Sequence, residues 1–309
     1  MNRHELVDAV TIAASAVALR NARFFARSVE SPAIREAVSG SRLSPDSIRP
    51  EGISEVVAAT PVGGFRGAYL AWNWVAPDAP TLIFHHGSGE DPFDFGRFSA
   101  NSVRRLFTAE GLDAINLIAV RAPFHDRSSR EYARAMGELT NFAGMLATST
   151  AIVDALTTAL RERGCPTVLV SGISLGGWVT NLHRAFVGGA DRYVPIFAGA
   201  ALGEVFATST YRRMTGESAR ARPRRLRETL NFERVFVESG ADCSPLLARY
   251  DRIVEFETQR PCYRGTPLAV IEKGHVTGSL ATAALRDHLR TAVERTVTPE
   301  RGPDTVADR

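Results

Sequence analysis

The 309-residue sequence predicts an α/β fold with a mostly parallel sheet and helices on both of its faces. Two observations support this prediction. From residue 81 onward, apolar runs of strand length alternate with longer segments of helical periodicity. The runs are apolar on both faces, which is typical of strands that helices cover on each side. Alternation of this kind implies right-handed crossovers between parallel strands.

The composition is that of an ordinary globular protein, with 44% hydrophobic and 23% charged residues. The net charge is only +3, so nothing in the composition favours binding to nucleic acid. Cys165, Cys243 and Cys262 lack metal-ligand spacing and are too few for a disulfide framework. We therefore expect no bound metal and a reducing, cytoplasmic location.

Residues 1–52 are expected to precede the main domain. The apolar run from Ala9 to Leu19 is too short to span a bilayer, and no signal-peptide cleavage site follows it. We predict an amphipathic helix from Glu5 to Arg27 that packs on the body of the protein. Membrane or partner docking through Phe24 and Phe25 is the alternative. Residues 31–52, rich in Ser, Pro, Gly and Arg, are predicted to be a connecting loop.

The main domain is predicted to span residues 53–298 and to open with a hairpin. Its two strands, at 53–59 and 65–75, flank the turn sequence Pro61-Val62-Gly63-Gly64. Gly164 and Pro166 end a long helix, as a C-cap glycine and a helix-breaking proline do. The remaining predicted strands are 81–85, 114–120, 167–171, 193–197, 244–248 and 267–271, and the predicted helices are 96–110, 141–163, 175–187 and 279–296.

The alternation breaks between Gly203 and Gly240, a segment that we interpret as an inserted and mostly helical cap. The cap is rich in arginine, above all between Arg220 and Arg227. A solvated basic face is the preferred interpretation of these arginines, and steering of an acidic substrate is the alternative. Residues 299–309 are predicted to form a polar tail.

Gly172-Ile173-Ser174-Leu175-Gly176 is a G-x-S-x-G pattern between a predicted strand and a predicted helix. In this pattern the chain turns sharply and leaves the serine exposed at the tip of the turn. Gly172 and Gly176 allow the two arms of the turn to pass closely. The helix that opens at Leu175 offers free backbone N–H groups beside the serine. The pattern also occurs by chance, so its interpretation depends on two further stretches.

The first of these stretches is His86-Gly87-Ser88-Gly89, directly after the predicted strand at 81–85. Its glycines, Gly87 and Gly89, keep the loop tight, so that the backbone N–H of Ser88 can point at an oxygen that becomes negative during acyl transfer. The N–H of Leu175 is the predicted second donor. A plain glycine-rich turn is the alternative, and His85 and His86 are expected to brace the loop rather than to act as bases.

The second stretch supplies a base and an acid. His275 follows the last predicted strand, and Asp251 follows the strand before it. Ser, Asp and His in this chain order, each at the carboxyl end of a strand, suit nucleophilic catalysis on an α/β sheet. His275 would take the proton of Ser174, and Asp251 would orient and stabilise the imidazole. Glu204 is the alternative acid, whereas Asp242 lies too early in the chain.

These motifs resemble those of the α/β-hydrolase fold superfamily over roughly residues 53–296. The resemblance implies an eight-stranded sheet with one antiparallel strand near its start and a cap after the sixth strand. It further implies a cofactor-free serine hydrolase that cleaves a carboxylic ester or thioester of a small-molecule acyl substrate. An acyltransferase, a peptidase and a non-catalytic binding module are the alternatives on the same fold.

The loop from Arg121 to Arg127 is similar to that of poorly characterised hydrolase-domain proteins, although it lacks the glycine-rich turn that many relatives carry there. His125 and Asp126 lie in this loop. They are expected to brace it, and lining of the substrate pocket is the alternative.

Overall fold

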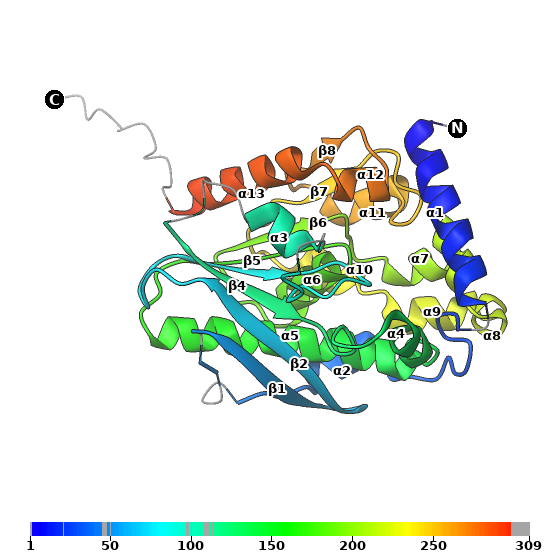
Figure 1. Ribbon diagram of the computed structural model, residues 1–309, viewed down its shortest axis with the longest axis horizontal. Coiled ribbons are helices and arrows are strands. Elements are labelled where there is room, and N and C mark those ends of the chain that lie inside the picture. Colours follow the sequence, from blue (N-terminus) through cyan, green and yellow to red (C-terminus); the bar gives the residue numbers. More distant parts are fainter. Residues whose placement is uncertain are drawn as a thin grey trace.

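The computed structural model describes residues 2–20, 22–44, 48–49, 51–96, 99, 101–107, 112 and 114–297. The predicted polar tail lies outside the described residues. Eight strands form a single sheet in the order β1-β2-β4-β3-β5-β6-β7-β8 (Figure 1). They are β1 (Ile53–Thr60), β2 (Gly63–Asn73), β3 (Thr81–His85), β4 (Asn116–Arg121), β5 (Val168–Ile173), β6 (Arg192–Ile196), β7 (Leu246–Ala248) and β8 (Ala269–Ile271).

The sheet is mostly parallel, as the sequence predicts. Strand β2 runs antiparallel to both of its neighbours, β1 and β4, and every other neighbouring pair is parallel. Strands β3 and β5 are buried along their whole length, which explains their apolar sequences. The carboxyl ends of the parallel strands meet at one edge of the sheet, where ligands bind in folds of this kind.

Helices cover both faces of the sheet (Figure 1). On one face lie α2 (Ile34–Ser39), α5 (Leu139–Glu162) and α6 (Leu175–Phe186). On the other face, α3 (Ser102–Phe107) and α13 (Thr282–Val297) pack over a second apolar core. By length and composition α5 could cross a membrane, but 89% of its most apolar window is buried inside the protein. Helix α5 is therefore a core helix of this fold.

The segment between β6 and β7 contains the cap and is helical. Its elements are α7 (Leu202–Ala207), the 3-10 helix η2 (Thr210–Met214), α8 (Glu217–Arg220), α9 (Pro223–Leu230) and α10 (Glu233–Glu238). Some of its arginines make specific contacts instead of only facing solvent. Arg227 binds Glu204 of α7, and Arg225 binds the carbonyl oxygen of Ser31. These contacts fix α9 against its neighbours.

The N-terminal helix is shorter than predicted. Helix α1 (Arg3–Leu19) ends eight residues before Arg27, and the chain continues in a non-helical segment. Phe24 and Phe25 leave the helix because both are buried, in an aromatic cluster with Phe206. Neither side chain is therefore exposed for docking to a membrane or a partner, and contact through the rest of the N-terminal helix stays a prediction.

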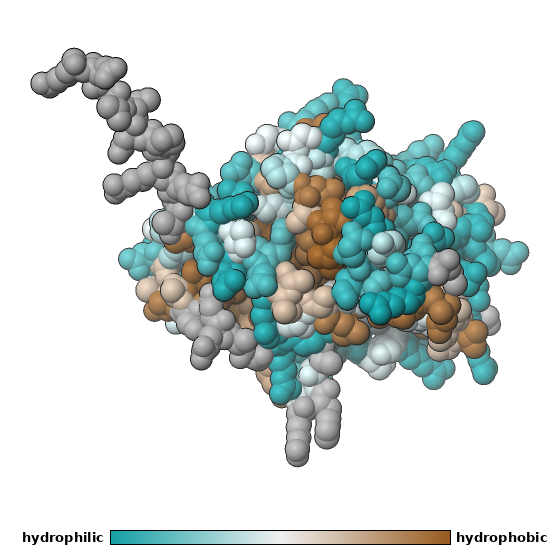
Figure 2. Space-filling view, turned by 90° about the horizontal axis from the view of Figure 1, so that it is seen from above, coloured by the Kyte–Doolittle hydropathy of each residue, from teal (hydrophilic) through white to brown (hydrophobic). Residues whose placement is uncertain are grey.

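The exposed apolar side chains of this region lie on α1 instead. Leu6, Val7, Val10 and Val17 all face solvent on this helix. Figure 2 shows another aspect of the surface, a mostly hydrophilic face on which hydrophobic side chains gather in separate patches. A folded protein normally exposes some apolar side chains, so this observation alone assigns no partner to α1.

Four further predictions of secondary structure need correction. The expected loop at 31–52 contains α2, because Ile34, Ala37 and Val38 form a short apolar stripe that is buried. The expected helix at 96–110 is helical only as α3, and several of its other residues lie outside the described ones. Helix α4 (Ser129–Ala135) was not predicted, nor were α11 (Phe256–Gln259) and η3 (Arg260–Tyr263). The expected helix at 279–296 is preceded by a separate short helix, α12 (His275–Ser279).

Candidate active site

Ser174 lies at the turn between β5 and α6, and its backbone is strained. Its φ is 53°, in the left-handed region that residues with a side chain seldom adopt. The two flanking glycines leave no room for a side chain. A Cβ on Gly172 would lie 2.4 Å from the carbonyl carbon of Gly176, and a Cβ on Gly176 would lie 2.1 Å from the carbonyl oxygen of His85. The close passage predicted from the G-x-S-x-G pattern is thus present.

The structure brings Ser174, His275 and Asp251 into one chain of hydrogen bonds. His275 Nε2 lies 2.9 Å from Ser174 Oγ, and His275 Nδ1 lies 2.7 Å from Asp251 Oδ2. The other carboxylate oxygen of Asp251 accepts the backbone N–H groups of Ile253 and Val254 at 2.8 and 2.7 Å. Since a carboxylate can only accept, Nδ1 of His275 carries the proton and Nε2 is free to accept the serine hydroxyl.

The acid beside His275 is Asp251, not the alternative Glu204. Glu204 binds Arg227 through both carboxylate oxygens, at 2.5 and 3.0 Å. Asp242 is exposed and pairs with Arg192. His275 itself lies in a helix and not in a loop, because it is the first residue of α12. Its backbone N–H is therefore one of the donors at a helix N-terminus that have no partner within their own helix.

Burial and charge act in opposite directions on His275. Burial alone would lower the pKa of the imidazole, but the charge and hydrogen bond of Asp251 outweigh it. The pKa of His275 therefore lies above its ordinary value of about 6.5. Burial also raises the pKa of Asp251, against the opposing charge and hydrogen bond of His275. The proton of the hydrogen bond between the two side chains therefore stays on Nδ1 of the imidazole.

The loop after β3 leaves one backbone donor unused, and so does the start of α6. Neither the N–H of Ser88 nor that of Leu175 has a hydrogen-bond partner among the described residues. These are the two donors that the sequence predicts for a developing negative charge. The neighbouring N–H groups are occupied, that of Gly87 by Glu90, that of Gly89 by His125 and that of Gly176 by the carbonyl oxygen of His86.

The three histidines beside this loop are neutral braces. His86 Nε2 accepts the N–H of Ala122 at 3.0 Å, so its Nδ1–H donates to the carbonyl oxygen of Gly87. Burial lowers the pKa of His85 to about 3 and that of His125 to about 4. His125 braces Gly89 and does not line the cavity beside Ser174. Asp126 pairs with Arg66 and is also absent from the cavity wall.

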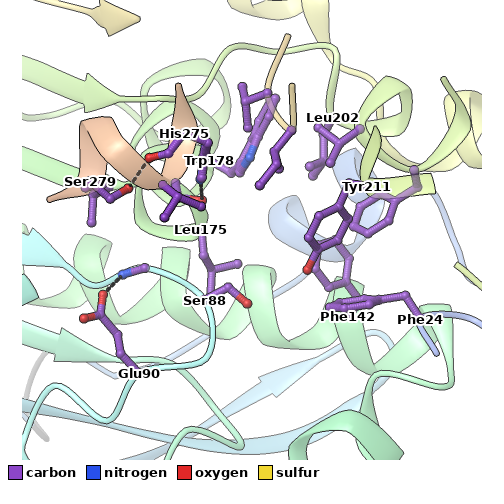
Figure 3. Close-up of a pocket in the computed structure, with 18 of the residues that line it drawn as sticks. Phe24, Ser88, Glu90, Phe142, Leu175, Trp178, Leu202, Tyr211, His275 and Ser279 are labelled. Carbon is purple, nitrogen blue, oxygen red and sulfur yellow. Dashed lines mark hydrogen bonds between the residues drawn. The ribbon is translucent and has the colours of Figure 1, made fainter. Parts of the chain in front are cut away.

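A cavity of about 380 Å³ opens from Ser174 toward the cap (Figure 3). Ser174, Ser88 and His275 contribute to its polar part. The greater part of the wall is apolar and comes from the N-terminal segment, α5, α6, α7 and η2. Its apolar and aromatic residues include Phe24, Phe142, Trp178, Leu202, Val205, Phe206 and Tyr211.

Neither this wall nor the role of Glu90 was predicted from the sequence. Phe24 and Phe142 are far apart in the chain, so no local pattern could connect them with Ser174. Glu90 could have been suspected, since it follows the glycine-rich loop directly. Its carboxylate binds the N–H of Gly87 at 2.6 Å and the hydroxyl of Ser102 at 2.7 Å. Among the described residues, no group of His, Cys, Asp and Glu is placed to hold a metal ion.

No protein-family model and no characterised protein sequence matches this chain. Solved structures are similar to it. The acylaminoacyl peptidase of Pyrococcus horikoshii matches 84% of this chain and 44% of its own length, at 14% identity and a TM-score of 0.54. The esterase Pf2001 of Pyrococcus furiosus matches 80% of this chain and 92% of its own, at 15% identity and a TM-score of 0.53. A prolyl endopeptidase matches 84% of this chain and 39% of its own, at 11% identity and a TM-score of 0.54.

This chain therefore spans less than half the length of either peptidase and most of the length of the esterase. At identities this low, the similarity establishes the fold. The chain has the α/β-hydrolase fold, as the motifs around Ser174, Asp251 and His275 predict.

Proposed function

We propose that the protein is a serine hydrolase that cleaves a carboxylic ester or thioester with an apolar acyl group, through an acyl-enzyme. The observation that carries this proposal is the chain of hydrogen bonds from Ser174 through His275 to Asp251, at 2.9 and 2.7 Å. A serine hydroxyl is a weak nucleophile unless a base takes its proton. This geometry supplies the base and a buried acid that orients it.

In the first half of the reaction, Ser174 Oγ bonds to the carbonyl carbon of the substrate while its proton passes to His275 Nε2. The resulting imidazolium is stabilised by Asp251, which keeps its negative charge. His275 then gives this proton to the oxygen or sulfur of the leaving group as the bond between that atom and the carbonyl carbon breaks. The products of this half are a free alcohol or thiol and an ester between Ser174 and the acyl group.

In the second half, a water molecule replaces the leaving group. His275 Nε2 takes one proton from the water, and the water oxygen bonds to the acyl carbon. The bond between this carbon and Ser174 Oγ then breaks, and the serine oxygen recovers a proton from His275. A carboxylic acid leaves, and the enzyme returns to its starting state.

The carbonyl oxygen becomes negative in both halves, and the proposal assigns it to the N–H groups of Ser88 and Leu175. Both donors lack another partner among the described residues, so neither has to break a bond in order to bind the oxygen. Leu175 is also the first residue of α6, where the helix dipole favours negative charge. Preorganised donors of this kind act without reorganisation during the reaction.

The cavity supports an apolar acyl group as the part of the substrate that lies beneath the cap. Aromatic and aliphatic side chains dominate its wall, although polar side chains also line it, namely Glu90, Arg105, Tyr211 and Ser279. A charged acyl group would lose its hydration against these apolar side chains, whereas an apolar one would not. The arginines of the cap do not line this cavity in the structure, although Arg105 of α3 does.

The test is a panel of p-nitrophenyl esters and matched thioesters of graded acyl length, assayed with the wild type and with Ser174→Ala. We expect turnover of apolar acyl groups that is lost in Ser174→Ala. Amide substrates are included, because two of the similar structures are peptidases. Folded wild-type protein that turns over no member of the panel would contradict the proposal, and preferred turnover of the amides would replace esterase with peptidase activity.

A further inference from the structure

Asp8, on the inner face of α1, is a buried carboxylate with no role in the mechanism above. It is 0% exposed, and its two oxygens accept three backbone N–H groups from the far end of the chain. Oδ2 accepts His275 at 2.8 Å and Arg252 at 3.1 Å, and Oδ1 accepts Val276 at 2.9 Å. All three donors are more than 240 positions away in sequence.

These three donors belong to the two segments that carry the acid and the base. Arg252 follows Asp251 directly, and His275 and Val276 form the first turn of α12. The N–H groups of this turn have no partner within their own helix. The positive end of the helix dipole also stabilises a carboxylate at this position. Asp8 therefore joins the backbone of the acid's segment to the backbone of the base's helix.

A second residue of α1, His4, contacts the same two segments. His4 Nδ1 lies 2.9 Å from Thr277 Oγ1 of α12, and its ring stacks on that of Tyr250. Gly274, which precedes α12, passes so close that a Cβ on it would lie 2.8 Å from Asp8 Oδ2. Helix α1 thus contacts both the segment of the acid and the helix of the base, although the sequence analysis places it before the main domain.

We propose that Asp8 is a positioning residue that holds the His275 imidazole and the Asp251 carboxylate in register for proton transfer from Ser174. This inference rests on the proposed serine hydrolase function. Among the described residues, Asp8 makes its hydrogen bonds to the backbone N–H groups of Arg252, His275 and Val276, so it acts through the backbone beside the acid and at the base. Its negative charge is also placed to stabilise the imidazolium that forms when Ser174 loses its proton.

Other charged groups near His275 and Asp251 also contribute to the electrostatics of this site. Asp251 faces His275 directly, and Asp8 adds a second, more distant negative charge that raises the pKa of His275 in the same direction. Arg252 carries an opposite charge next to Asp251 and lies 3.8 Å from Glu5 of α1. Burial lowers the pKa of His4, and the charges of Arg3 and Lys273 act in the same direction, while the charge of Asp8 opposes them. Only Asp8 among these groups touches the backbone of His275.

The test is Asp8→Asn in the full chain, since asparagine keeps the shape, loses the charge and turns an N–H donor toward one of the three backbone donors. We expect kcat/KM for the best ester to fall between about tenfold and about 100-fold, mostly in kcat, because small misplacements of catalytic groups have effects of this size. We also expect the acid limb of the pH profile to move to lower pH, because the imidazolium has lost a stabilising charge.

The matched control is Ile12→Ala, which removes buried apolar contacts of the same helix one turn further along. It should lower the thermal unfolding temperature while kcat and the acid limb stay as in the wild type. Asp8→Glu serves as a second variant, because it keeps the charge and alters the geometry; it should lower kcat without moving the acid limb. An Asp8→Asn protein with the wild-type kcat, or with an unmoved acid limb, would overturn the inference.

An NMR titration of the His275 ring keeps this test separate from that of the proposed function. The resonance can be assigned among the seven histidines with His275→Gln. A lower pKa of His275 in Asp8→Asn than in the wild type is expected whether or not a substrate is known. Equal values would overturn the positioning role, while a wild type that hydrolyses no ester or thioester would count against the proposed function alone.

Discussion

Two regions of the molecule build the candidate site, and they do so in different ways. At the sheet edge, the segments that follow β3, β5, β7 and β8 carry Ser88, Ser174, Asp251 and His275, the residues to which we assign the reaction. The N-terminal segment, from α1 to Phe25, supplies the brace Asp8 and part of the apolar wall through Phe24. The proposed reacting groups thus carry a local sequence pattern, whereas the residues that place them are defined by contacts between distant parts of the chain.

Among substitutions in these two regions, we expect Asp251→Asn to cause the largest loss of ester turnover. The amide would favour the wrong tautomer of His275, so ester turnover should fall by about 10⁴-fold in kcat. Burst titration of active sites and the unfolding temperature would show that the protein remains folded. A loss no larger than that of Asp8→Asn would break the distinction between a residue of the relay and a residue that positions it.

The next effect concerns the backbone donor after β3. Ser88→Pro removes the N–H that we assign to the negative oxygen, and kcat should fall by about 10²- to 10³-fold. Ser88→Ala is the backbone-preserving comparison and should lose much less, since only its hydroxyl contact with Tyr132 disappears. Steady-state rates on one activated ester measure both variants. Equal losses would show that the side chain, and not the N–H, is what matters.

A smaller effect is expected at the apolar wall. Val205 of α7 is buried and lines the cavity, so Val205→Phe should fill part of its 380 Å³. The ratio of kcat/KM for long over short acyl esters should fall by about tenfold, the size of effect that one or two methylenes have in an apolar pocket. Val205→Ala is the control and should shift the ratio in the opposite direction. An unchanged ratio in both variants would place the acyl group elsewhere.

The smallest expected effect is a shift of the acid limb of the wild-type pH profile of kcat/KM. His275 must be neutral to accept the proton of Ser174, so activity is lost as pH falls through its pKa. Because Asp251 raises this pKa in spite of burial, kcat/KM should decline below an apparent pKa that lies above about 6.5. A pH profile between pH 5 and 9 measures it. A limb well below the ordinary value for histidine would contradict the electrostatic account of the pair.

The sequence predicts the sheet and its edge well, for physical reasons that differ from those of the cap and the N-terminus. Buried strands such as β3 and β5 are apolar on both faces, and Gly172 and Gly176 are required by a backbone passage that no side chain permits. These requirements involve residues that are close in the sequence, and the sequence therefore predicts them.

The contacts of α1 cannot be predicted from a local sequence pattern, because they join residues that are far apart in the chain. Asp8 looks like a surface residue in an amphipathic helix until Arg252, His275 and Val276 are placed against it. Likewise, the end of α1 at Leu19 is set by the burial of Phe24 and Phe25 in a cluster that forms only in the folded protein. Tertiary contacts of this kind override helical propensity, and a single sequence does not reveal them.

The most direct test of the serine hydrolase assignment is the reaction of the folded protein with a fluorophosphonate probe, followed by mass spectrometry of the labelled peptide. We expect one adduct, on Ser174, that forms quickly in the wild type and is absent from Ser174→Ala. A folded wild-type protein that stays unlabelled, or an adduct that persists in the alanine variant, would contradict it.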